Sequence, residues 1–391
     1  MAVRKEVIEL KAYLVELRRN FHRYPELSGK EYQTALRIEK ELEEMGIPHI
    51  RVGETGVIGI LENDSCEEET QTIILRADID ALSIEEQNKV AYKSQNPGVM
   101  HACGHDGHTV ALLGAAKVLS QYKANLKQRV ILLFQQAEEI GAGAKQFLGT
   151  KYWKPIDKIM GIHFASFLPT GKILVQTGES NASCDYFKII VKGRSCHVSK
   201  PQDGIDALYI GSQIVVGIQA VAARMTNPLD PVVVGIGKMY SGTNYNIVAN
   251  RAVLEGTTRA FNHTVRSKIN EAVMEIAISI ARAYGAEVEV QFESYAAPLI
   301  NHCDVAKEIA GIMGQIVGKQ QVIVNGPKTM MADDFAEYLQ VMKGSYIFVG
   351  SSHNEATSYP HHHEQFDLDE EALLIAADAY ISFVLGDAPW S

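Results

Sequence analysis

The chain has 391 residues, of which 46% are hydrophobic and 21% charged, and its formal net charge is -10. Such a composition is typical of a globular protein with roughly two to three domains. Because the charge is negative and no basic run interrupts it, we expect neither a nucleic-acid partner nor binding to an anionic membrane surface. A small-molecule substrate is favoured instead.

The cellular compartment follows from three further observations. The first residues mix charges into every turn and do not resemble a secretory signal. We expect no uncharged apolar run of the ~20 residues that span a bilayer. The five cysteines are scattered and contain no Cys-x-x-Cys pair, so a disulfide framework or a zinc ribbon is not expected. The sequence therefore predicts a cytoplasmic protein without a membrane segment.

The N-terminal part is expected to be helical over residues 5–46. Apolar residues recur there at helical spacing between 10 and 21, and a second amphipathic run covers 31–45. Residues 24–29, Tyr-Pro-Glu-Leu-Ser-Gly, predict a turn between the two runs.

Buried strands are expected after these helices, because short apolar runs follow that are too short for helices. They lie at 72–75, 130–134, 159–162 and 346–349. Helical stretches, such as 110–119, separate several of them. This alternation predicts an α/β catalytic domain with a mostly parallel central sheet covered by helices.

The middle of the chain changes character between about 182 and 297. Longer alternating strand segments are predicted at 184–192, 232–240, 252–261 and 286–292, and helices at 205–225 and 265–284. The order β-α-β-β-α-β is that of a ferredoxin-like α+β domain. We therefore predict that residues 182–297 are an inserted domain, and that 1–181 and 298–391 form one catalytic domain.

Polar side chains follow the predicted buried strands at the point where each strand ends. Residues 76–80 follow the first run, 135–139 the second, His163 the third, and the histidines 361–363 come after the fourth. Ligands of open α/β sheets bind outside the carboxyl ends of the strands. These distant residues are therefore expected to converge on one site.

The segment 100–108, Met-His-Ala-Cys-Gly-His-Asp-Gly-His, holds a thiol, three imidazoles and a carboxylate in nine residues. Gly104 permits the sharp turn that lets Cys103 and His105 both point inward. Thiolate and neutral imidazole are ligands that suit zinc and its first-row neighbours. The segment therefore predicts a metal site.

The candidate ligands exceed what one tetrahedral metal requires. They are Cys103, His105, Glu139, His163 and one of the histidines 361–363. Two metals that share a bridging ligand, roughly 3.5–4 Å apart, would use all five and leave positions for water and substrate. Cys103 could be that bridge. The alternative is a cluster that only stabilises the fold, because a single strand-end histidine or acidic pair is usually an ordinary polar residue.

A water activated by metals also needs a base that takes its proton and returns it to the leaving group. Glu138 and Glu139 are adjacent, so one could ligate a metal while the other faces the water. Their spacing alone does not decide which residue has which role.

At these residues the sequence resembles the aminoacylase, hippurate hydrolase and indole-acetyl-amino-acid hydrolase group of dinuclear metallo-amidohydrolases. This group is a branch of the acetylornithine deacetylase, succinyl-diaminopimelate desuccinylase and carboxypeptidase superfamily. The resemblance runs over nearly the whole chain. It rests on the segments 21–27, 76–82, 101–108, 137–139, 256–261 and 366–370.

The resemblance implies specific roles for the candidate residues. The implied ligands of two divalent ions are Cys103, His105, Glu139, His163 and His362, and Glu138 is the implied general base. His362 is chosen because Phe366 lies four residues later, as in the family pattern His-x-x-x-Phe, although the triple histidine leaves the register open by one. Zinc and manganese are favoured, and cobalt and nickel also tolerate this ligand set.

The family also implies that the inserted domain is a lid that carries substrate-binding groups and forms a homodimer or higher homo-oligomer. The matching residues here are His197, Asn246 and Arg259. Imidazole and amide donors suit a polarised carbonyl, and a guanidinium suits a substrate carboxylate. The alternative for Arg259 is a salt bridge on the face of its strand.

The sequence thus predicts a metal-dependent amidohydrolase that cleaves N-acyl-amino acids to a carboxylate and a free amino acid. A dipeptidase or aminopeptidase of the same superfamily is the alternative among hydrolases. A non-catalytic binder with this fold is the alternative from another class, and the intact Glu138 argues against it. A redox thiol enzyme is disfavoured because no second cysteine lies near Cys103 in the sequence.

Overall fold

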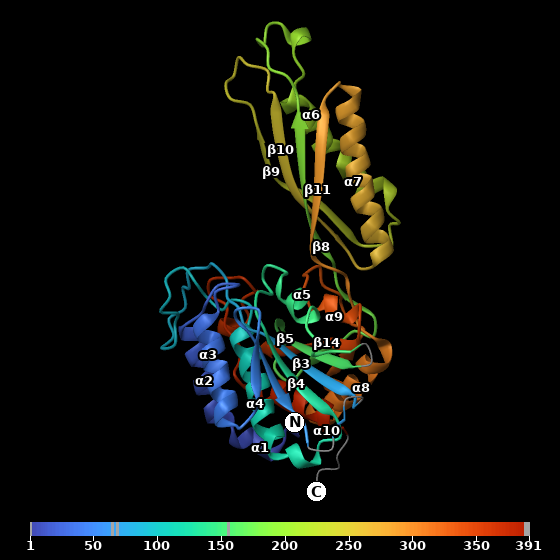
Figure 1. Cartoon of the computed structure of the whole chain (residues 1–391). Coiled ribbons are helices and arrows are strands. Elements are labelled where there is room, and N and C mark those ends of the chain that lie inside the picture. The colour runs from blue at the N-terminus through green and yellow to red at the C-terminus, as the bar shows by residue number, and fades with distance from the viewer. Residues whose placement is uncertain (1, 64–65, 68–69, 155–156, 387–391) are drawn as a thin grey trace. The chain divides into compact units, whose positions relative to one another are not determined.

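The computed structural model describes residues 2–63, 66–67, 70–154 and 157–386. They form two compact units (Figure 1). Unit 1 holds the residues up to 178, 301–328 and those from 333 onward, and unit 2 holds 179–300 and 329–332. Each unit is described by itself.

Unit 1 contains a mixed eight-stranded sheet in the order β1-β2-β4-β3-β5-β14-β6-β13. Its strands are β1 (His49–Val52), β2 (Gly56–Leu61), β3 (Thr72–Asp78), β4 (Arg129–Gln135), β5 (Lys158–Pro169), β6 (Ile173–Val175), β13 (Val322–Val324) and β14 (Lys343–Ser352). The central strands β4, β3, β5 and β14 are parallel to one another. Antiparallel pairs join β1, β2 and β6 to them.

The helices of unit 1 cover both faces of this sheet. They are α1 (Lys5–Glu9), α2 (Lys11–Arg23), α3 (Tyr32–Glu44), α4 (His105–Gln121), α5 (Gly143–Leu148), α8 (Cys303–Met313), α9 (Ala336–Leu339) and α10 (Glu371–Leu385). Helices α4 and α10 pack against each other beneath the strands (Figure 1). All seven residues of β3 are buried, and its apolar stretch 73–75 is typical of a strand covered on both faces.

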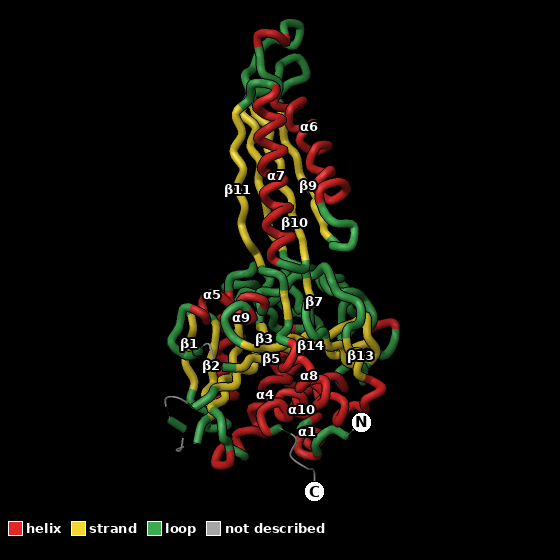
Figure 2. Tube along the Cα trace, turned by 90° about the vertical axis from the view of Figure 1, so that its right-hand side faces the viewer, coloured by secondary structure: helices red, strands yellow, loops and turns green. Residues whose placement is uncertain are grey.

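Unit 2 has a four-stranded antiparallel sheet in the order β11-β8-β10-β9. Its elements are β7 (Glu179–Asn181), β8 (Cys184–Lys192), α6 (Ala207–Ala220), β9 (Val232–Ser241), β10 (Arg251–Ala260), α7 (His263–Ala283), β11 (Glu287–Ala296) and β12 (Leu299–Ile300). Helices α6 and α7 lie side by side along the sheet (Figure 2). Burial alternates along β8, as expected for a sheet with one helix-covered face.

The predicted fold class is confirmed, since a central α/β sheet and a ferredoxin-like β-α-β-β-α-β unit are both present. The residues expected to be helical over 5–46 form three helices, and the helix expected at 110–119 is part of α4. The functional division into a catalytic domain and a lid stays a prediction.

One helix of unit 2 bears on the expectation that no segment spans a membrane. The segment Ala207–Met225, which is α6 with its π-helical extension, is long and apolar enough for a membrane span by length and composition, with a mean hydropathy of 1.3. Within unit 2, its Ile210, Ile214 and Ile218 are buried at a spacing of four residues. This spacing is that of a core-facing helix, which passes the same test.

Candidate metal centre

The predicted ligand residues come from the carboxyl-end side of the parallel strands. Glu138 and Glu139 follow β4, and His163 lies within β5. Cys103 and His105 stand where α4 begins, after the chain has left β3. Gly104 is the N-cap of α4 with a φ of 92°, a backbone conformation that glycine adopts without strain. The helix therefore starts at His105, with that side chain in its first turn.

The five predicted ligand residues form two groups that share Cys103. The donor atoms of Cys103, His105 and His163 all lie within 4.8 Å of one another, and so do those of Cys103, Glu139 and His362. The Sγ of Cys103 is 3.4 Å from Nε2 of His163, and Nε2 of His362 is 3.5 Å from Oε1 of Glu139. One thiol thus stands between two sets of ligand atoms.

The chemistry of this donor set fits divalent cations. Nε2 of His105 and Oε1 of Glu139 are buried and form no hydrogen bond with any residue that the structure describes. Burial, and then the charges of Glu139 and Glu138, raise the pKa of the Cys103 thiol well above its usual range. Burial lowers the pKa of His105, but Asp78 and Asp80 outweigh it and raise that pKa to about 10. These carboxylates attract positive charge to the cluster.

Two of the ligand histidines are oriented by hydrogen bonds from their other ring nitrogen. His163 donates from Nδ1 to the carbonyl oxygen of Phe164 at 2.6 Å, so its Nε2 lacks a proton and can ligate a metal. His105 contacts Oδ1 of Asp80 through Nδ1 at 3.1 Å. Such partners fix the tautomer and the ring direction of a metal ligand.

The structure also separates the three consecutive histidines. His362 has a φ of 64° and lies with Cys103 and Glu139. His361 instead donates from Nε2 to the carbonyl oxygen of Phe164 at 2.9 Å. The ring of His363 stacks on Tyr359 with 4.7 Å between centroids. The geometry therefore favours the register that the resemblance implied.

His108, the third histidine of the 100–108 segment, lies within 4.8 Å of ligand atoms of His105 and Asp78, but contacts within the protein engage both of its ring nitrogens. Its Nε2 accepts the backbone N–H of Phe164 at 2.9 Å, which requires the proton to be on Nδ1. That Nδ1 lies 2.6 Å from Oδ1 of Asp78. Both ring nitrogens are thus engaged within the protein.

Glu138 is buried beside the ligand atoms. Its carboxylate lies within 4.8 Å of the carboxylates of Asp333 and Asp334. It also lies within 4.8 Å of ligand atoms of His105 and Glu139. Burial, then Asp333 and then Glu139, raise the pKa of Glu138 well above its usual range. A carboxylate of this kind holds a proton readily, as a general acid–base group must.

Sequence reasoning placed residues 76–80 at the site but missed the contacts that they make behind these ligands. Arg76 is fully buried in β3, and its Nη1 donates to Asp78 at 2.6 Å while Nη2 donates to Asp334 at 3.0 Å. Its Nε donates to Oε1 of Gln135 at 2.9 Å. A charged residue directly after the apolar run 72–75 was the available signal, but the sequence did not name its partners.

A second buried pair fixes the start of α4. Oδ2 of Asp106, the neighbour of His105, lies 2.8 Å from Nε of Arg18 and 2.7 Å from Nδ1 of His22. Both partners come from α2, whose apolar spacing gave no sign of this contact. Charges buried so completely are stable only when they are paired.

The three predicted substrate-binding residues belong to unit 2. Nδ1 of His197 accepts the backbone N–H of Ser199 at 3.1 Å, which leaves Nε2 as the ring nitrogen that carries the proton. His197 also pairs through a β-bridge with Ile247, next to Asn246, whose buried Oδ1 has no hydrogen-bond partner among the described residues. Arg259 donates from Nη1 to the carbonyl oxygen of Met330 at 2.7 Å.

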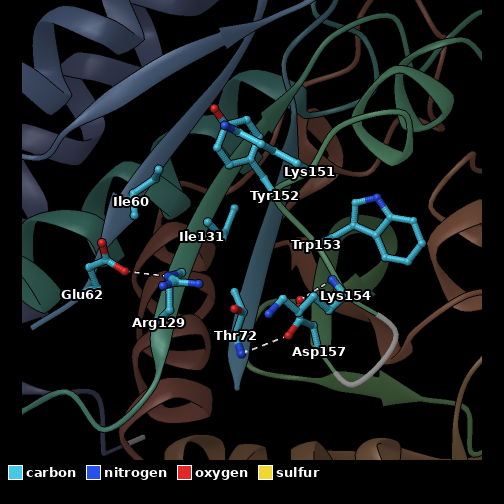
Figure 3. A pocket seen from close by; sticks show the side chains of 10 residues that line it. All are labelled: Ile60, Glu62, Thr72, Arg129, Ile131, Lys151, Tyr152, Trp153, Lys154 and Asp157. Atoms are coloured by element: carbon cyan, nitrogen blue, oxygen red, sulfur yellow. Dashed lines mark hydrogen bonds and ion pairs between the residues drawn. The ribbon is translucent and has the colours of Figure 1, made fainter. Parts of the chain in front are cut away.

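Unit 1 has a cavity of about 250 Å³ that does not adjoin the ligand cluster (Figure 3). Thr72 and Arg129 line it, and they are the first residues of β3 and β4, so the cavity lies at the amino ends of these parallel strands. Arg129 pairs with Glu62 at 2.6 Å, and Asp157 accepts the backbone N–H of Thr72 at 3.1 Å. Two of its lining carboxylates, Glu62 and Asp157, are thus paired within the lining.

Known proteins resemble this chain over almost its whole length. N-acetyl-L-cysteine deacetylase of Bacillus subtilis is 36% identical over 94% of this chain and 86% of the relative. Thermostable carboxypeptidase 1 of Saccharolobus solfataricus is 35% identical over 97% of this chain and 96% of the relative. The crystal structure of the YXEP protein of Bacillus subtilis, described as a dinuclear metal-binding peptidase from the M20 family, superposes with a TM-score of 0.83. It is 33% identical and covers 97% of this chain and 98% of that chain.

The model of peptidase family M20/M25/M40 matches residues 74–386, which include every predicted ligand and the predicted base. The resemblance inferred from the sequence is thereby confirmed, and the chain belongs to peptidase family M20/M25/M40.

Proposed function

We propose that this protein is a metal-dependent amidohydrolase that cleaves the amide bond of N-acyl-amino acids. The observation that carries the proposal is the pair of ligand groups sharing Cys103, with the buried carboxylate of Glu138 beside them. The deacetylase relative supports an acyl-amino acid as the substrate.

The proposed ligands are Cys103, His105, Glu139, His163 and His362, which would hold two divalent ions, with zinc and manganese favoured. When bound, such ions polarise a carbonyl oxygen and make water a stronger nucleophile. Asp80 and the carbonyl oxygen of Phe164 keep the ring nitrogens of His105 and His163 directed at the site.

In the proposed reaction, Glu138 takes a proton from the attacking water as its oxygen bonds to the acyl carbon. Glu138 then returns this proton to the amide nitrogen, the carbon–nitrogen bond breaks, and a carboxylic acid and a free amine leave. The burial of Glu138 supports this role because the surroundings favour its protonated form after the first transfer.

The proposed substrate contacts lie in unit 2, which we propose to be a lid. The Nε2 proton of His197 would be donated to the substrate carbonyl oxygen, with Asn246 as a second polar contact. Arg259 would bind the carboxylate of the amino-acid part.

Release of free amine tests this proposal most directly. N-acetyl and N-benzoyl amino acids are offered to the protein after reloading with manganese or zinc, with Glu138→Gln as the control. We expect release by the wild type and not by the control. No release across the panel by wild-type protein that holds two metals per chain would refute the proposal.

A peptidase is the second candidate, because one relative is a carboxypeptidase. Comparing N-acetyl amino acids with unblocked dipeptides separates the two activities. An aminopeptidase or dipeptidase that needs a free amino group prefers the dipeptides, whereas the proposed amidohydrolase prefers the blocked substrates.

The remaining expectations concern location and assembly. All five cysteines are free thiols, which supports a location in the cytoplasm.

We propose a homodimer through unit 2, supported by exposed apolar side chains on α6 such as Val216, which is 68% exposed. Light scattering on the purified full chain gives the mass, and a monomer would refute this assembly.

A further inference from the structure

We propose that the segment 28–31, here named the clasp, positions the tripeptide 137–139, which carries the proposed base and one proposed metal ligand. The clasp lies between α2 and α3. Its side chains Ser28 and Glu31 make the contacts described below. This inference rests on the proposed function for the base role of Glu138 and for the ligand roles of Glu139 and His105.

Glu31 holds the backbone in front of the base. Its side chain is fully buried, and Oε1 accepts the backbone N–H of Ala137 at 2.9 Å and that of Gly29 at 2.8 Å. Oε2 accepts the hydroxyl of Thr55 at 2.6 Å. A buried carboxylate with three donors is a firm anchor, because losing a donor or the acceptor leaves a buried polar group unpaired.

Ala137 needs such an anchor because its φ is 54°. Residues with a Cβ adopt this left-handed conformation only where the surroundings impose it. The conformation of Ala137 sets the direction in which the next residues, Glu138 and Glu139, leave the strand end. Without Glu31, the backbone would relax toward negative φ and turn both carboxylates.

Ser28 reaches the other end of the same tripeptide through Asp80. Its hydroxyl donates to Oδ2 of Asp80 at 2.6 Å, and that oxygen also accepts the backbone N–H of Glu139 at 2.9 Å. Oδ1 of Asp80 lies 3.1 Å from Nδ1 of the proposed ligand His105. The clasp is thus connected to residues 137, 139 and 105, and hence to both proposed metal positions.

The buried position of Glu31 is not explained by a role as the N-terminal cap of α3. Glu31 occupies the N-cap position, but its side chain makes no capping hydrogen bond to the described residues of this helix. Glu26 takes that role, because its Oε2 accepts the backbone N–H of Thr34 at 2.8 Å and the hydroxyl of the same residue at 2.9 Å. Glu26 therefore caps α3, whereas Glu31 binds the backbone of Ala137.

The experiment compares Glu31→Ala with the matched control Glu26→Ala in the full chain. Mn²⁺ binding to the metal-free protein is measured by calorimetry, and thermal unfolding and steady-state kinetics are recorded on the same samples. Removing outer-shell partners of metal sites costs about 10–100-fold in affinity or activity. We expect a loss of that size in Mn²⁺ affinity and in kcat for Glu31→Ala, and wild-type values for Glu26→Ala.

Two further variants identify the mechanism. Glu31→Gln keeps an acceptor for both N–H groups and should retain Mn²⁺ affinity and kcat. Adding Ala137→Gly to Glu31→Ala should recover part of the loss, because glycine adopts positive φ without the hydrogen bond to Glu31. KM should stay within about twofold throughout, since none of these side chains is proposed to touch the substrate.

The proposal is overturned if Glu31→Ala lowers the unfolding temperature as Glu26→Ala does but leaves Mn²⁺ affinity and kcat unchanged. Should Glu31→Ala fail to fold, Ser28→Ala serves instead, because it removes one hydroxyl from a partly exposed site. Unchanged Mn²⁺ affinity in that variant overturns the proposal as well. The Mn²⁺ titration needs no substrate, so the clasp can stand even if the wild type cleaves no N-acyl-amino acid and the proposed function fails.

Discussion

At the two ends of strands β3 and β4 in unit 1, the polar groups described above differ in their pairing. At the amino ends of β3 and β4, Arg129 pairs with Glu62, and Asp157 accepts the backbone N–H groups of Thr72 and Lys154. On the carboxyl-end side, buried atoms of His105 and Glu139 have no hydrogen-bond partner among the described residues. The buried atoms of two proposed ligands therefore lack the partners that the named groups at the amino ends have.

Residues with a strained backbone also lie near the proposed ligands. Three described residues other than glycine have positive φ, and two of them, Ala137 and His362, carry or precede the proposed ligands and base. Strain persists only where surrounding contacts impose it, and here it coincides with the unpaired atoms. The predictions below test whether this contrast is functional.

The largest effect is expected from Cys103→Ala, because it removes the one donor common to both ligand groups. We expect the loss of both tightly bound metals and of activity, measured by elemental analysis after dialysis and by amine release. Cys303→Ala, an exposed thiol on α8, is the matched control and should keep both. Two metals per chain in Cys103→Ala would show that the thiol is not shared.

Glu138→Gln should follow in size. Removing a general base lowers turnover by about 10²–10⁴-fold, and the metals should stay because Glu138 is not among the proposed ligands. Glu139→Gln is the contrasting variant, in which metal content falls. If Glu138→Gln turned over substrate at nearly the normal rate, the base would have to be another group.

Asp80→Asn should give an intermediate effect. The amide would no longer accept fully from both Nδ1 of His105 and the N–H of Glu139, so we expect metal affinity to fall by about 10–100-fold. Competition with a chelating dye measures this change. An affinity equal to that of the wild type would mean that the ring of His105 is oriented by other contacts.

The smallest effect is expected at the amino ends of the strands. Arg129→Gln breaks an ion pair with a partly exposed Glu62, and such pairs contribute about 0–1 kcal/mol to the free energy of unfolding. Chemical denaturation should detect no larger change, and kcat and metal content should equal those of the wild type. A fall in kcat would abolish the contrast between the two ends of the sheet.

Much of this arrangement could be predicted because the signals are local in sequence. The apolar runs at 72–75 and 159–162 mark buried strands, but the strands extend beyond these runs, so that Arg76 and Asp78 lie within β3 and His163 within β5. The family resemblance then assigned the ligands, and the chain's membership in that family is confirmed. The assignments of single residues stay predictions.

The residues that sequence reasoning missed act through partners far away along the chain. Arg76 pairs with Asp334, and Ser28 with Asp80, and no periodicity connects such residues. Thr329 groups with unit 2 because its N–H donates to the carbonyl oxygen of Ser180. Pairings of this kind are decided by packing in three dimensions, which a single sequence does not reveal.

The backbone of Phe164 serves three histidines at once. Its N–H is donated to His108, and its carbonyl oxygen accepts from His163 and His361. Replacing Phe164 by alanine would remove the ring that stacks on His108 but would leave these polar groups in place. Alanine scanning would therefore report Phe164 as a packing residue. An ester in place of the 163–164 amide, which removes the N–H of Phe164, would be needed to reveal the contact with His108, and an ester in place of the 164–165 amide, which weakens the carbonyl acceptor, the contacts with His163 and His361.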